Sequence, residues 1–558
     1  MVTRKASKST ATTPAELRDL MWKAADKLRG SMNSSDYMNF VLGLIFLKYL
    51  SDSFDERAEA IRAEIAEDGF EGQELEEELE AYLNDPDEFY SASVYFVPEK
   101  ARWGFIAQQA KSGSVGELLD AAMREIMDAN PRLNGALSEI YNRENVDQTR
   151  LAGLIDLFSN ADFKAMRKDT GRSSLDILGE VYEYFLGQFA AKQGQRGGEF
   201  YTSRSVVRTL VEILNPVDGK LYDPCCGSGG MFVQSEKFVE AHGKQFKQEK
   251  GYEPSLTVYG QEYNDQTWKL ARLNLAIHGI FGHLGDRWGD TFAEDRHAGE
   301  NFDFVMANPP FNLKEWSRRT DDPRWNFGVP PERNANYAWL QHIWSKLNAG
   351  GSAAVVLANG SMTSNTGGED EIRRAMVQGD AVAAMLVLPA NLFTGTAISV
   401  CVWVLAKDKS AGKRGTSERK GEVLMIDARS LGRMIDRKTR VFDDEDIQKI
   451  AGAWHRWRST DSELNTGVYE DELGFCKSVT VEDIEKQEWA LTPGRYVGSA
   501  VVEETGEPVD VRIARLRVTL AEQFAESAHL AEVVQKHLAA LELPDVPAEV
   551  TATESEVA

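Results

Sequence analysis

The chain has 558 residues, which is too long for one ordinary domain and predicts two to four structural units. A hydrophobic share of 42% supports real cores and excludes a globally disordered chain. The formal net charge of −25 excludes nucleic-acid binding through a generally basic surface, so such binding needs a local basic groove or a partner chain.

Cysteine use and the lack of an apolar leader indicate the compartment. The first residues are basic and polar, without the apolar run of a secretory signal. The most apolar helix-like segment, residues 40–50, is too short to span a bilayer. The four cysteines show no C-x-x-C spacing; they are Cys225, Cys226, Cys401 and Cys476. We therefore expect a cytoplasmic protein with no membrane contact, no disulfide framework and no metal site.

The chain opens with a predicted helical domain. Residues 1–13 are polar and expected to be disordered, and residues 14–165 read mostly as helix. One apolar face recurs at helical spacing behind a plausible N-cap at Ser34-Ser35-Asp36; it consists of Tyr37, Phe40, Val41, Leu44 and Leu47. The acidic run at residues 71–80 predicts the solvated face of another helix.

Residues 166–410 are predicted to form an α/β domain. A helix over residues 174–189 leads into residues 194–203, where paired glycines before aromatic residues indicate a backbone bent around a ligand or an interdomain turn. The strand candidates are residues 220–222, 257–261, 302–306, 353–357, 384–388 and 400–405, and the clearest helices are residues 265–278 and 336–347. This alternation predicts a Rossmann-like, doubly wound and largely parallel sheet.

The remaining residues are expected to form three further segments. Residues 407–420 read as an exposed loop, and residues 411–500 as an extension of the α/β domain. Residues 501–543 predict one long helix, with an apolar stripe made of Ile513, Leu516, Leu520, Phe524, Ala531, Val534, Leu538 and Leu541. Residues 544–558 form an acidic tail that is expected to be mobile. The stripe suits docking against a partner helix or packing within the chain.

A glycine-rich loop follows the first predicted strand, at the sheet edge where ligands of open parallel sheets bind. It reads Asp223-Pro224-Cys225-Cys226-Gly227-Ser228-Gly229-Gly230. The loop alone fits a nucleoside cofactor, a dinucleotide or a tight turn, but it lacks the G-x-G-x-x-G spacing and the P-loop lysine. Glu262 ends the second strand, where a carboxylate can accept hydrogen bonds from ribose hydroxyls. Asp290 can accept from the adenine amino group of a nucleoside donor or close a loop turn.

The most specific element is Asn308-Pro309-Pro310-Phe311, directly after the third predicted strand. An exocyclic base amine is a poor nucleophile because its lone pair is delocalised into the ring. The Asn308 side-chain oxygen and the Pro309 carbonyl can accept its two hydrogens, which turns the lone pair toward a methyl sulfonium and stabilises the developing charge. Successive prolines fix φ, and Phe311 offers a face for a base turned out of the duplex. The motifs predict an amino-methyltransferase acting on a nucleic-acid base.

Two weaker signals lie downstream. Residues 314–327 mix cations with aromatics and predict either a DNA-contacting surface or an ordinary lid or packing loop; they include Lys314, Trp316, Arg318, Arg319, Arg324, Trp325 and Phe327. Asn391-Leu392-Phe393 either forms a wall of the base pocket or packs in the core.

Together these motifs resemble the gamma-type amino-methyltransferases, in particular the modification subunit of type I restriction–modification systems. The resemblance covers roughly residues 15–540. Besides the glycine loop and Asn308-Pro309-Pro310-Phe311, it includes Leu28-Arg29-Gly30, Phe46-Leu47-Lys48-Tyr49-Leu50-Ser51, Gly198-Glu199-Phe200-Tyr201-Thr202, Gln261-Glu262 and Leu491-Thr492-Pro493-Gly494-Arg495-Tyr496. The Glu-Phe-Tyr-Thr stretch is its most family-specific part.

The resemblance implies S-adenosylmethionine as donor and adenine methylated on its exocyclic nitrogen as product. By position, the donor-binding residues would be Glu199, Phe200, Tyr201, Thr202, Ser203, Arg204, Asp223, Gly227, Ser228, Gly229, Gly230, Glu262 and Asp290. The catalytic residues would be Asn308, Pro309, Pro310 and Phe311. Ser203 departs from the proline of many relatives, so a less rigid backbone is expected there. Cys225 and Cys226 are expected to be packed loop residues, because amine methylation needs no covalent enzyme intermediate.

The resemblance also accounts for the acidic charge, because it implies that a separate specificity subunit recognises the DNA sequence. The C-terminal helix would help to engage that subunit. Two copies of this chain with one specificity subunit would form the methyltransferase, and a motor–nuclease subunit would join for cleavage. Nothing in the chain resembles a P-loop, so it is not expected to translocate DNA itself.

Two alternatives stay open at the level of sequence. The enzyme could methylate another planar amine or amide, such as an RNA base or a protein glutamine, because Asn-Pro-Pro-aromatic motifs resemble those enzymes too. Cytosine amino-methylation is a lesser form of this alternative. A non-catalytic subunit that binds the donor and senses methylation is the other.

Overall fold

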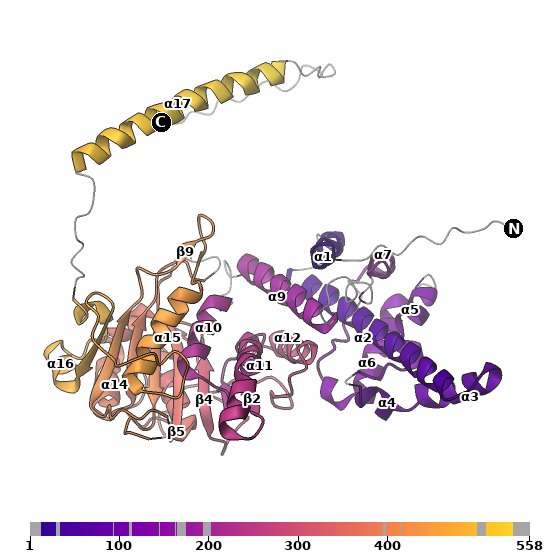
Figure 1. Ribbon diagram of the computed structural model, residues 1–558, viewed down its shortest axis with the longest axis horizontal. Coiled ribbons are helices and arrows are strands. Elements are labelled where there is room, and N and C mark those ends of the chain that lie inside the picture. Colours follow the sequence, from indigo (N-terminus) through magenta and orange to yellow (C-terminus); the bar gives the residue numbers. More distant parts are fainter. Residues whose placement is uncertain are drawn as a thin grey trace. The chain divides into compact units, whose positions relative to one another are not determined.

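The computed structural model describes residues 13–28, 34–92, 94–110, 114–143, 146–161, 163, 174–193, 202–393, 398–412, 414–498 and 509–539. The chain divides into two compact units, Met1–Gly498 and Ser499–Ala558, each coloured by sequence in Figure 1. The expected disordered ends fall outside the described residues, except for Thr13.

The amino-terminal part of the first unit is helical, as predicted. Its helices are α1 (Pro14–Leu28), α2 (Ser34–Glu67), α3 (Gly72–Leu83), α4 (Pro86–Tyr90), α5 (Trp103–Gln109), α6 (Val115–Ala129), α7 (Gln148–Phe158) and α9 (Ser174–Gln193). The acidic run lies on α3, where all its residues except Leu79 are exposed or half-buried. The helix α2 begins at Ser34, so the predicted cap forms its first turn.

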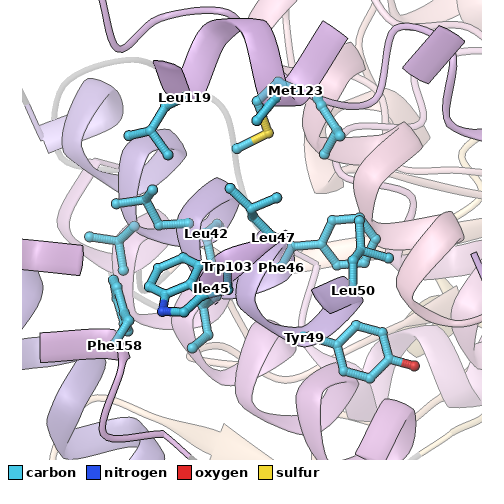
Figure 2. Close-up of a cluster of buried hydrophobic side chains, with 14 of the residues drawn as sticks. Leu42, Ile45, Phe46, Leu47, Tyr49, Leu50, Trp103, Leu119, Met123 and Phe158 are labelled. Atoms are coloured by element: carbon cyan, nitrogen blue, oxygen red, sulfur yellow. The ribbon is translucent and has the colours of Figure 1, made fainter. Parts of the chain in front are cut away.

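The helix α2 is buried on all sides over residues 39–51, and not on one face as its spacing predicts. Figure 2 shows how Leu42, Ile45, Phe46, Leu47 and Leu50 of α2 pack against the other helices; their labelled neighbours are Trp103, Leu119, Met123 and Phe158. The reason is composition: this stretch is apolar almost all the way round, so the surrounding helices enclose it. Its one buried cation, Lys48, pairs with Asp52 one turn later.

A nine-stranded sheet forms the second half of this unit, in the order β11-β8-β6-β7-β5-β4-β1-β2-β3. Its strands are β1 (Gly219–Asp223), β2 (Leu256–Gly260), β3 (Gly282–His283), β4 (Phe302–Ala307), β5 (Leu347–Ala358), β6 (Val382–Val387), β7 (Val400–Ala406), β8 (Glu422–Asp427) and β11 (Cys476–Thr480). Only β7 and β11 run antiparallel to their neighbours. All six predicted strands are present, and the predicted parallel-rich sheet is confirmed. The short β3 and the strands β8 and β11 were not predicted.

Helices cover both faces of the sheet, which confirms the doubly wound arrangement. One face packs against α10 (Arg204–Leu214), α11 (Gly230–Lys250), α12 (Asp265–Ile277) and α15 (Asp444–Arg458). The other packs against α13 (Asn336–Lys346), α14 (Glu369–Gln378) and α16 (Val481–Lys486). The strands between them are buried on both sides and read as continuous apolar runs such as β6 and β7. A separate two-stranded hairpin, β9 (Arg433–Met434) and β10 (Arg440–Val441), follows β8.

The second unit consists of α17 (Val509–Ala539) among its described residues, which confirms the predicted long helix. Its 31 residues span about 46 Å at about 1.5 Å per residue. Several apolar side chains of the predicted stripe are exposed, namely Ile513, Leu520, Phe524 and Val534. Among the described residues, no helix has the length and hydropathy that crossing a membrane requires.

The packing of α2 generates a test of the helical core. A methyl group built at Gly43 would meet Tyr141 Oη, a fully buried side chain that donates to the Phe40 carbonyl at 3.2 Å. We expect Gly43→Ala to lower the melting temperature, because this overlap outweighs the roughly 1 kcal/mol by which helix interiors favour Ala over Gly. The matched control is the exposed Gly104 of α5, which has open space around its Cβ position. Gly104→Ala should leave stability unchanged or raise it, and equal effects of the two substitutions would contradict the packing described here.

Candidate active site

The carboxyl ends of three parallel strands bring the predicted site residues to one edge of the sheet. In the register, Asp223 of β1 lies beside Gly260 of β2, and Tyr222 lies beside Val305 of β4. Glu262 and Asn308 follow those strand ends by two residues and one residue. Residues that are far apart in the sequence therefore meet where ligands of parallel sheets bind.

The glycine loop is held open by backbone hydrogen bonds. Cys226 N donates to Gln261 O at 2.9 Å, and Gln261 N donates to Asp223 O at 3.0 Å, so the loop is tied to the end of β2. Gly227 and Gly229 have φ values of +54° and +77°, a region that favours glycine. A Cβ atom built at Gly227 or Gly230 would find nothing within 4 Å. These glycines therefore line open space, as a loop around a bound ligand requires.

Glu262 faces this loop from β2. Its Oε2 accepts from Gly227 N at 3.0 Å and its Oε1 accepts from Asn264 N at 2.9 Å, and the residue is only 9% exposed. These two bonds fix the orientation of the carboxylate. Each of its oxygens can accept a further hydrogen bond, because a carboxylate oxygen has more than one acceptor site. The arrangement suits an acceptor for the hydroxyl groups of a bound ribose, at the place that the sequence predicted.

Asp223 is buried at the end of β1. The pKa of Asp223 is raised to about 7: burial raises it most, hydrogen bonds from Cys225 oppose this effect, and the nearby Glu262 carboxylate adds a smaller rise. Cys226 is buried, and burial raises the pKa of the Cys225 and Cys226 thiols well above the usual range. Both cysteines are thus neutral packed residues, in line with the expectation that they are not nucleophiles.

Asp290 lies beside the loop but already has two partners. Its Oδ1 accepts from Phe292 N at 2.8 Å, which is the turn geometry that the sequence left open, and its Oδ2 accepts from Ser317 Oγ at 2.5 Å. Gln261 joins the neighbouring backbone to the glycine loop, because its Nε2 donates to Gly289 O at 3.2 Å and to Glu294 O at 2.7 Å. Sequence reasoning missed this role of Gln261, whose one available signal was its position next to Glu262.

Asn308 is oriented by a single contact with a residue over 100 positions away. Its Nδ2 donates to Thr202 Oγ1 at 2.8 Å. Its Oδ1 is buried, and no group in the described part of the chain donates to it. A buried acceptor without a donor costs about 1–3 kcal/mol. Such an atom at a site edge is suited to accept from an amine that enters the pocket.

The turn after Asn308 is locked by a reciprocal pair of amides. Asn312, with φ +53°, donates from its backbone N to Asn336 Oδ1 at 3.0 Å, and Asn336 Nδ2 donates back to Asn312 Oδ1 at 2.9 Å. Asn336 is the first residue of α13, so this pair of hydrogen bonds connects the turn after Asn308 to the start of that helix. Pro309 is buried and Pro310 half-buried. Sequence reasoning missed Asn312 and Asn336; the tolerance of Asn for positive φ was the one available hint.

Phe311 and the segment at residues 391–393 lie together. The rings of Phe311 and Phe393 are 6.4 Å apart and roughly perpendicular, and Leu392 belongs to the same apolar cluster. Phe393 and Leu392 are fully buried, so they back the Phe311 side chain from the core. Core packing is therefore confirmed for Leu392 and Phe393, and a wall of the base pocket stays a prediction.

The predicted donor segment is described only in part. Glu199, Phe200 and Tyr201 lie outside the described residues, whereas Thr202 and Ser203 are half-buried and Arg204 is exposed at the start of α10. Ser203 has φ −62° and ψ 145°, values that proline also adopts, and the expected lower rigidity at this position stays a prediction.

The cation-rich residues 314–327 are mainly a packing loop. Arg324 is paired internally, with Nη2 donating to Asp322 Oδ2 at 2.6 Å and Nη1 donating to Thr291 O at 2.9 Å. Trp316 and Trp325 pack against Phe292 in a small apolar cluster. Lys314 and Arg319 remain exposed. Of the two interpretations of this loop, the structure favours packing for Arg324 and its aromatic neighbours.

Comparisons with known proteins agree with this geometry. A family model described as N-6 DNA Methylase matches residues 173–505, and one described as HsdM N-terminal domain matches residues 17–158. The methylase subunit of the type I restriction enzyme HindI from Haemophilus influenzae is 42% identical over 80% of this chain and 99% of its own length. The MjaIX methylase subunit from Methanocaldococcus jannaschii is 34% identical over 94% of this chain and 91% of its own. The solved type I restriction-modification system methyltransferase subunit from Streptococcus thermophilus shares 26% identity and a TM-score of 0.69, covering 87% of this chain and 100% of that one.

The burial of Asp223 predicts a pH dependence of stability. An unfolded Asp has a pKa of about 3.9, whereas the buried carboxyl has one of about 7, so the folded protein binds the extra proton between these values. The free energy of unfolding of the natural protein should therefore fall as pH rises from 4 to 7, relative to Asp223→Asn. The difference should reach roughly 4 kcal/mol, at about 1.36 for each of about 3 pKa units. Chemical denaturation of both proteins across this range measures it, and parallel stability curves would show that Asp223 is ionised in the fold.

Proposed function

The chain belongs to the N-6 DNA methylase family as a methylase subunit of type I restriction–modification systems, and from this premise we propose that it transfers a methyl group from S-adenosylmethionine to the N6 atom of adenine in DNA. The observation that carries the proposal is the buried Asn308 Oδ1, which has no donor in the described part of the chain while Thr202 holds the other end of the amide.

The Asn308 amide is suited to activate an exocyclic amine. Thr202 accepts from Nδ2, so Oδ1 points away from that bond and can accept one hydrogen of the adenine amino group. The Pro309 carbonyl would accept the other. Two acceptors draw the amine hydrogens away from the ring plane, which localises the lone pair on nitrogen and stabilises the positive charge that develops during attack. Phe311, backed by Phe393, would stack on the base once it has left the duplex.

The residues at the edge of β1 and β2 fit the proposed donor. Gly227 and Gly230 line open space, and Glu262 is fixed beside them to accept from ribose hydroxyls. S-adenosylmethionine supplies a methyl group on a positively charged sulfur. The amine nitrogen forms the new bond to carbon as the carbon–sulfur bond breaks, the electron pair goes to sulfur, and a proton then leaves nitrogen for solvent. Glu199 to Arg204 and Asp290 complete the proposed donor site.

The proposed partners are DNA and a specificity subunit, with two copies of this chain per specificity subunit and a motor–nuclease subunit for cleavage. The exposed apolar side chains of α17 support docking of this helix on the specificity subunit, since exposed residues of one stripe bury well against a partner helix. We propose a cytoplasmic location, where the DNA is.

A substitution at Asn308 tests catalysis. We expect Asn308→Ala to lower the rate of methyl transfer about 100- to 1,000-fold, the range found when one group that stabilises developing charge is removed. Binding of S-adenosylmethionine, measured by calorimetry, should change far less than the rate, because Asn308 is not itself a proposed donor contact and reaches the donor site only through Thr202. The assay follows labelled methyl into DNA in the presence of the specificity subunit, with nucleoside analysis of the product.

Other outcomes of this assay separate the alternatives. Full activity of Asn308→Ala would contradict the proposed role of the amide. Wild-type protein that binds the donor and assembles but transfers no methyl would indicate a sensing subunit, and label that appears in RNA or protein in place of DNA would redirect the substrate.

A matched pair of substitutions on α17 tests docking. Phe524 is 67% exposed within the predicted stripe, and Val533 is 36% exposed on the opposite side of the helix. We expect Phe524→Asp to weaken co-purification with the specificity subunit at least about tenfold, because docking would bury an unpaired charge. Val533→Asp makes the same change of chemistry off the stripe and should have little effect. Equal retention of the subunit by both variants would place docking elsewhere.

A further inference from the structure

The β9–β10 hairpin, residues 431–442, lies at the same edge of the sheet as the catalytic motif. The hairpin follows β8, which runs parallel to β6. Both β6 and β5 run antiparallel to β7, so β6 and β5 have the same direction, and β4 runs parallel to β5. The strand β8 therefore has the direction of β4. The carboxyl end of β8 is therefore on the edge where Asn308 follows β4. Four strand spacings separate β8 from β4, about 19 Å at about 4.8 Å each. Figure 1 shows the hairpin at the label β9 projecting from the body of the first unit.

The hairpin is anchored to the support of the base pocket. Arg440 N donates to Asn391 O at 2.8 Å, directly before Leu392 and Phe393. Leu431 packs against the same apolar cluster as Phe311. The Arg440 guanidinium closes the base of the hairpin by donating from Nη1 to Leu431 O at 3.0 Å and to Gly432 O at 3.1 Å. The tip is thus held in a defined place relative to Phe311.

The tip carries three cations and one acid, Asp436, whose charge interacts with Lys438. Residues 433–438 are all exposed, and in the described part of the chain no carboxylate forms an ion pair with Arg433, Arg437 or Lys438. The one acid at the tip, Asp436, serves the turn, where its Oδ1 accepts from Lys438 N at 2.7 Å and Thr439 N at 2.9 Å. A tip with three cations and one acid is net positive, and such a cluster in a chain of net charge −25 is suited to a polyanion.

Two apolar side chains lie between the cations. Met434 is 42% exposed and Ile435 is 52% exposed. An apolar pair flanked by positive charges matches the composition of wedges that proteins insert between base steps, where cations hold the phosphates and apolar groups replace lost stacking. A protein partner would more commonly meet such a pair without a ring of free cations around it.

We propose that this hairpin is a DNA-contacting element that stabilises the duplex around the extruded base. Arg433, Arg437 and Lys438 bind phosphates, and Met434 and Ile435 pack into the space that the base leaves. The proposal rests on the proposed function, because it places DNA at the Asn308 edge. It assigns to this chain a DNA contact of its own, beside the reading of sequence by a separate subunit.

The test compares two triple variants in the complex of the full chain with its specificity subunit. Arg433→Ala/Arg437→Ala/Lys438→Ala removes the cluster, and Lys244→Ala/Lys247→Ala/Lys250→Ala removes the same charge from the far end of α11, which leads to the opposite edge of the sheet. The measurement is DNA affinity by fluorescence anisotropy over a series of salt concentrations. The hairpin variant should bind at least about tenfold more weakly, and its slope of log affinity against log salt should fall by up to about 2.7, at about 0.9 for each phosphate contact.

The control variant should keep the slope and affinity of the natural protein. The double variant Met434→Ala/Ile435→Ala should keep the salt slope but reduce the fluorescence rise of 2-aminopurine placed at the target position, because the extruded state loses its packing. A hairpin variant with unchanged slope and affinity overturns the proposal, as does one that fails to assemble with the specificity subunit, which would make the hairpin a protein contact. Failure of the proposed function is read separately, since it appears as absent methyl transfer by the natural protein.

Discussion

The hydrogen bond from Asn308 Nδ2 to Thr202 Oγ1 decides what the rest of the site can do. It fixes which end of the amide faces the pocket, so that Oδ1 stays buried without a donor among the described residues. A fold that only needed stability would satisfy that oxygen, because leaving it unpaired costs about 1–3 kcal/mol. The surrounding structure holds Asn308 in place from both sides. The residues before Asn308 are buried in β4, and the hydrogen bonds between Asn312 and Asn336 fix the turn after it. The unmet acceptor is then a prepared contact for a substrate amine.

Local patterns of the sequence predicted the parts of this arrangement that depend on local chemistry. The six strands are apolar runs between helices, so alternation alone placed them, and Gly227, Glu262 and Asn308 could be assigned to one edge because parallel strands end together. Contacts between distant segments could not be predicted. Nothing near Asn308 points to Thr202, and nothing in β7 marks it as antiparallel, since a buried central strand reads as the same apolar run in either direction. The burial of α2 on all sides was not predicted for a related reason. The helical spacing of apolar residues identifies one buried face, whereas the number of buried faces depends on the composition of the whole stretch.

The acidic composition of the chain and its proposed substrate are compatible because charge acts locally. At physiological ionic strength the screening length is about 8 Å, so acidic helix faces such as α3 would have little effect on a phosphate bound more than this distance away, as proposed at the sheet edge. What matters there is the sign of the nearest groups. At the β9–β10 tip three cations face one aspartate that is occupied by the turn. Arg324, in the loop of residues 314–327, differs from these cations. Its guanidinium is paired with Asp322 and donates to a backbone carbonyl, so it adds little to the positive potential at the surface.

The proposed chemistry of the pocket also gives a physical reason for the proposed second chain. An amide oxygen and a backbone carbonyl can recognise an exocyclic amine, and an aromatic ring can stack on the face of any base. The proposed contacts of Asn308, Pro309 and Phe311 would therefore exclude bases without such an amine but would not distinguish one adenine from another. Phosphate contacts from a hairpin fix position and register and carry no sequence information. Reading of a DNA sequence requires groups placed along the base edges of a groove, several base pairs beyond the reacting nucleotide. A catalytic edge built in this way would act at random sites unless it were joined to a chain that reads the sequence. The exposed apolar side chains of α17, about 46 Å of helix without a core of its own, suit the proposed docking on such a chain.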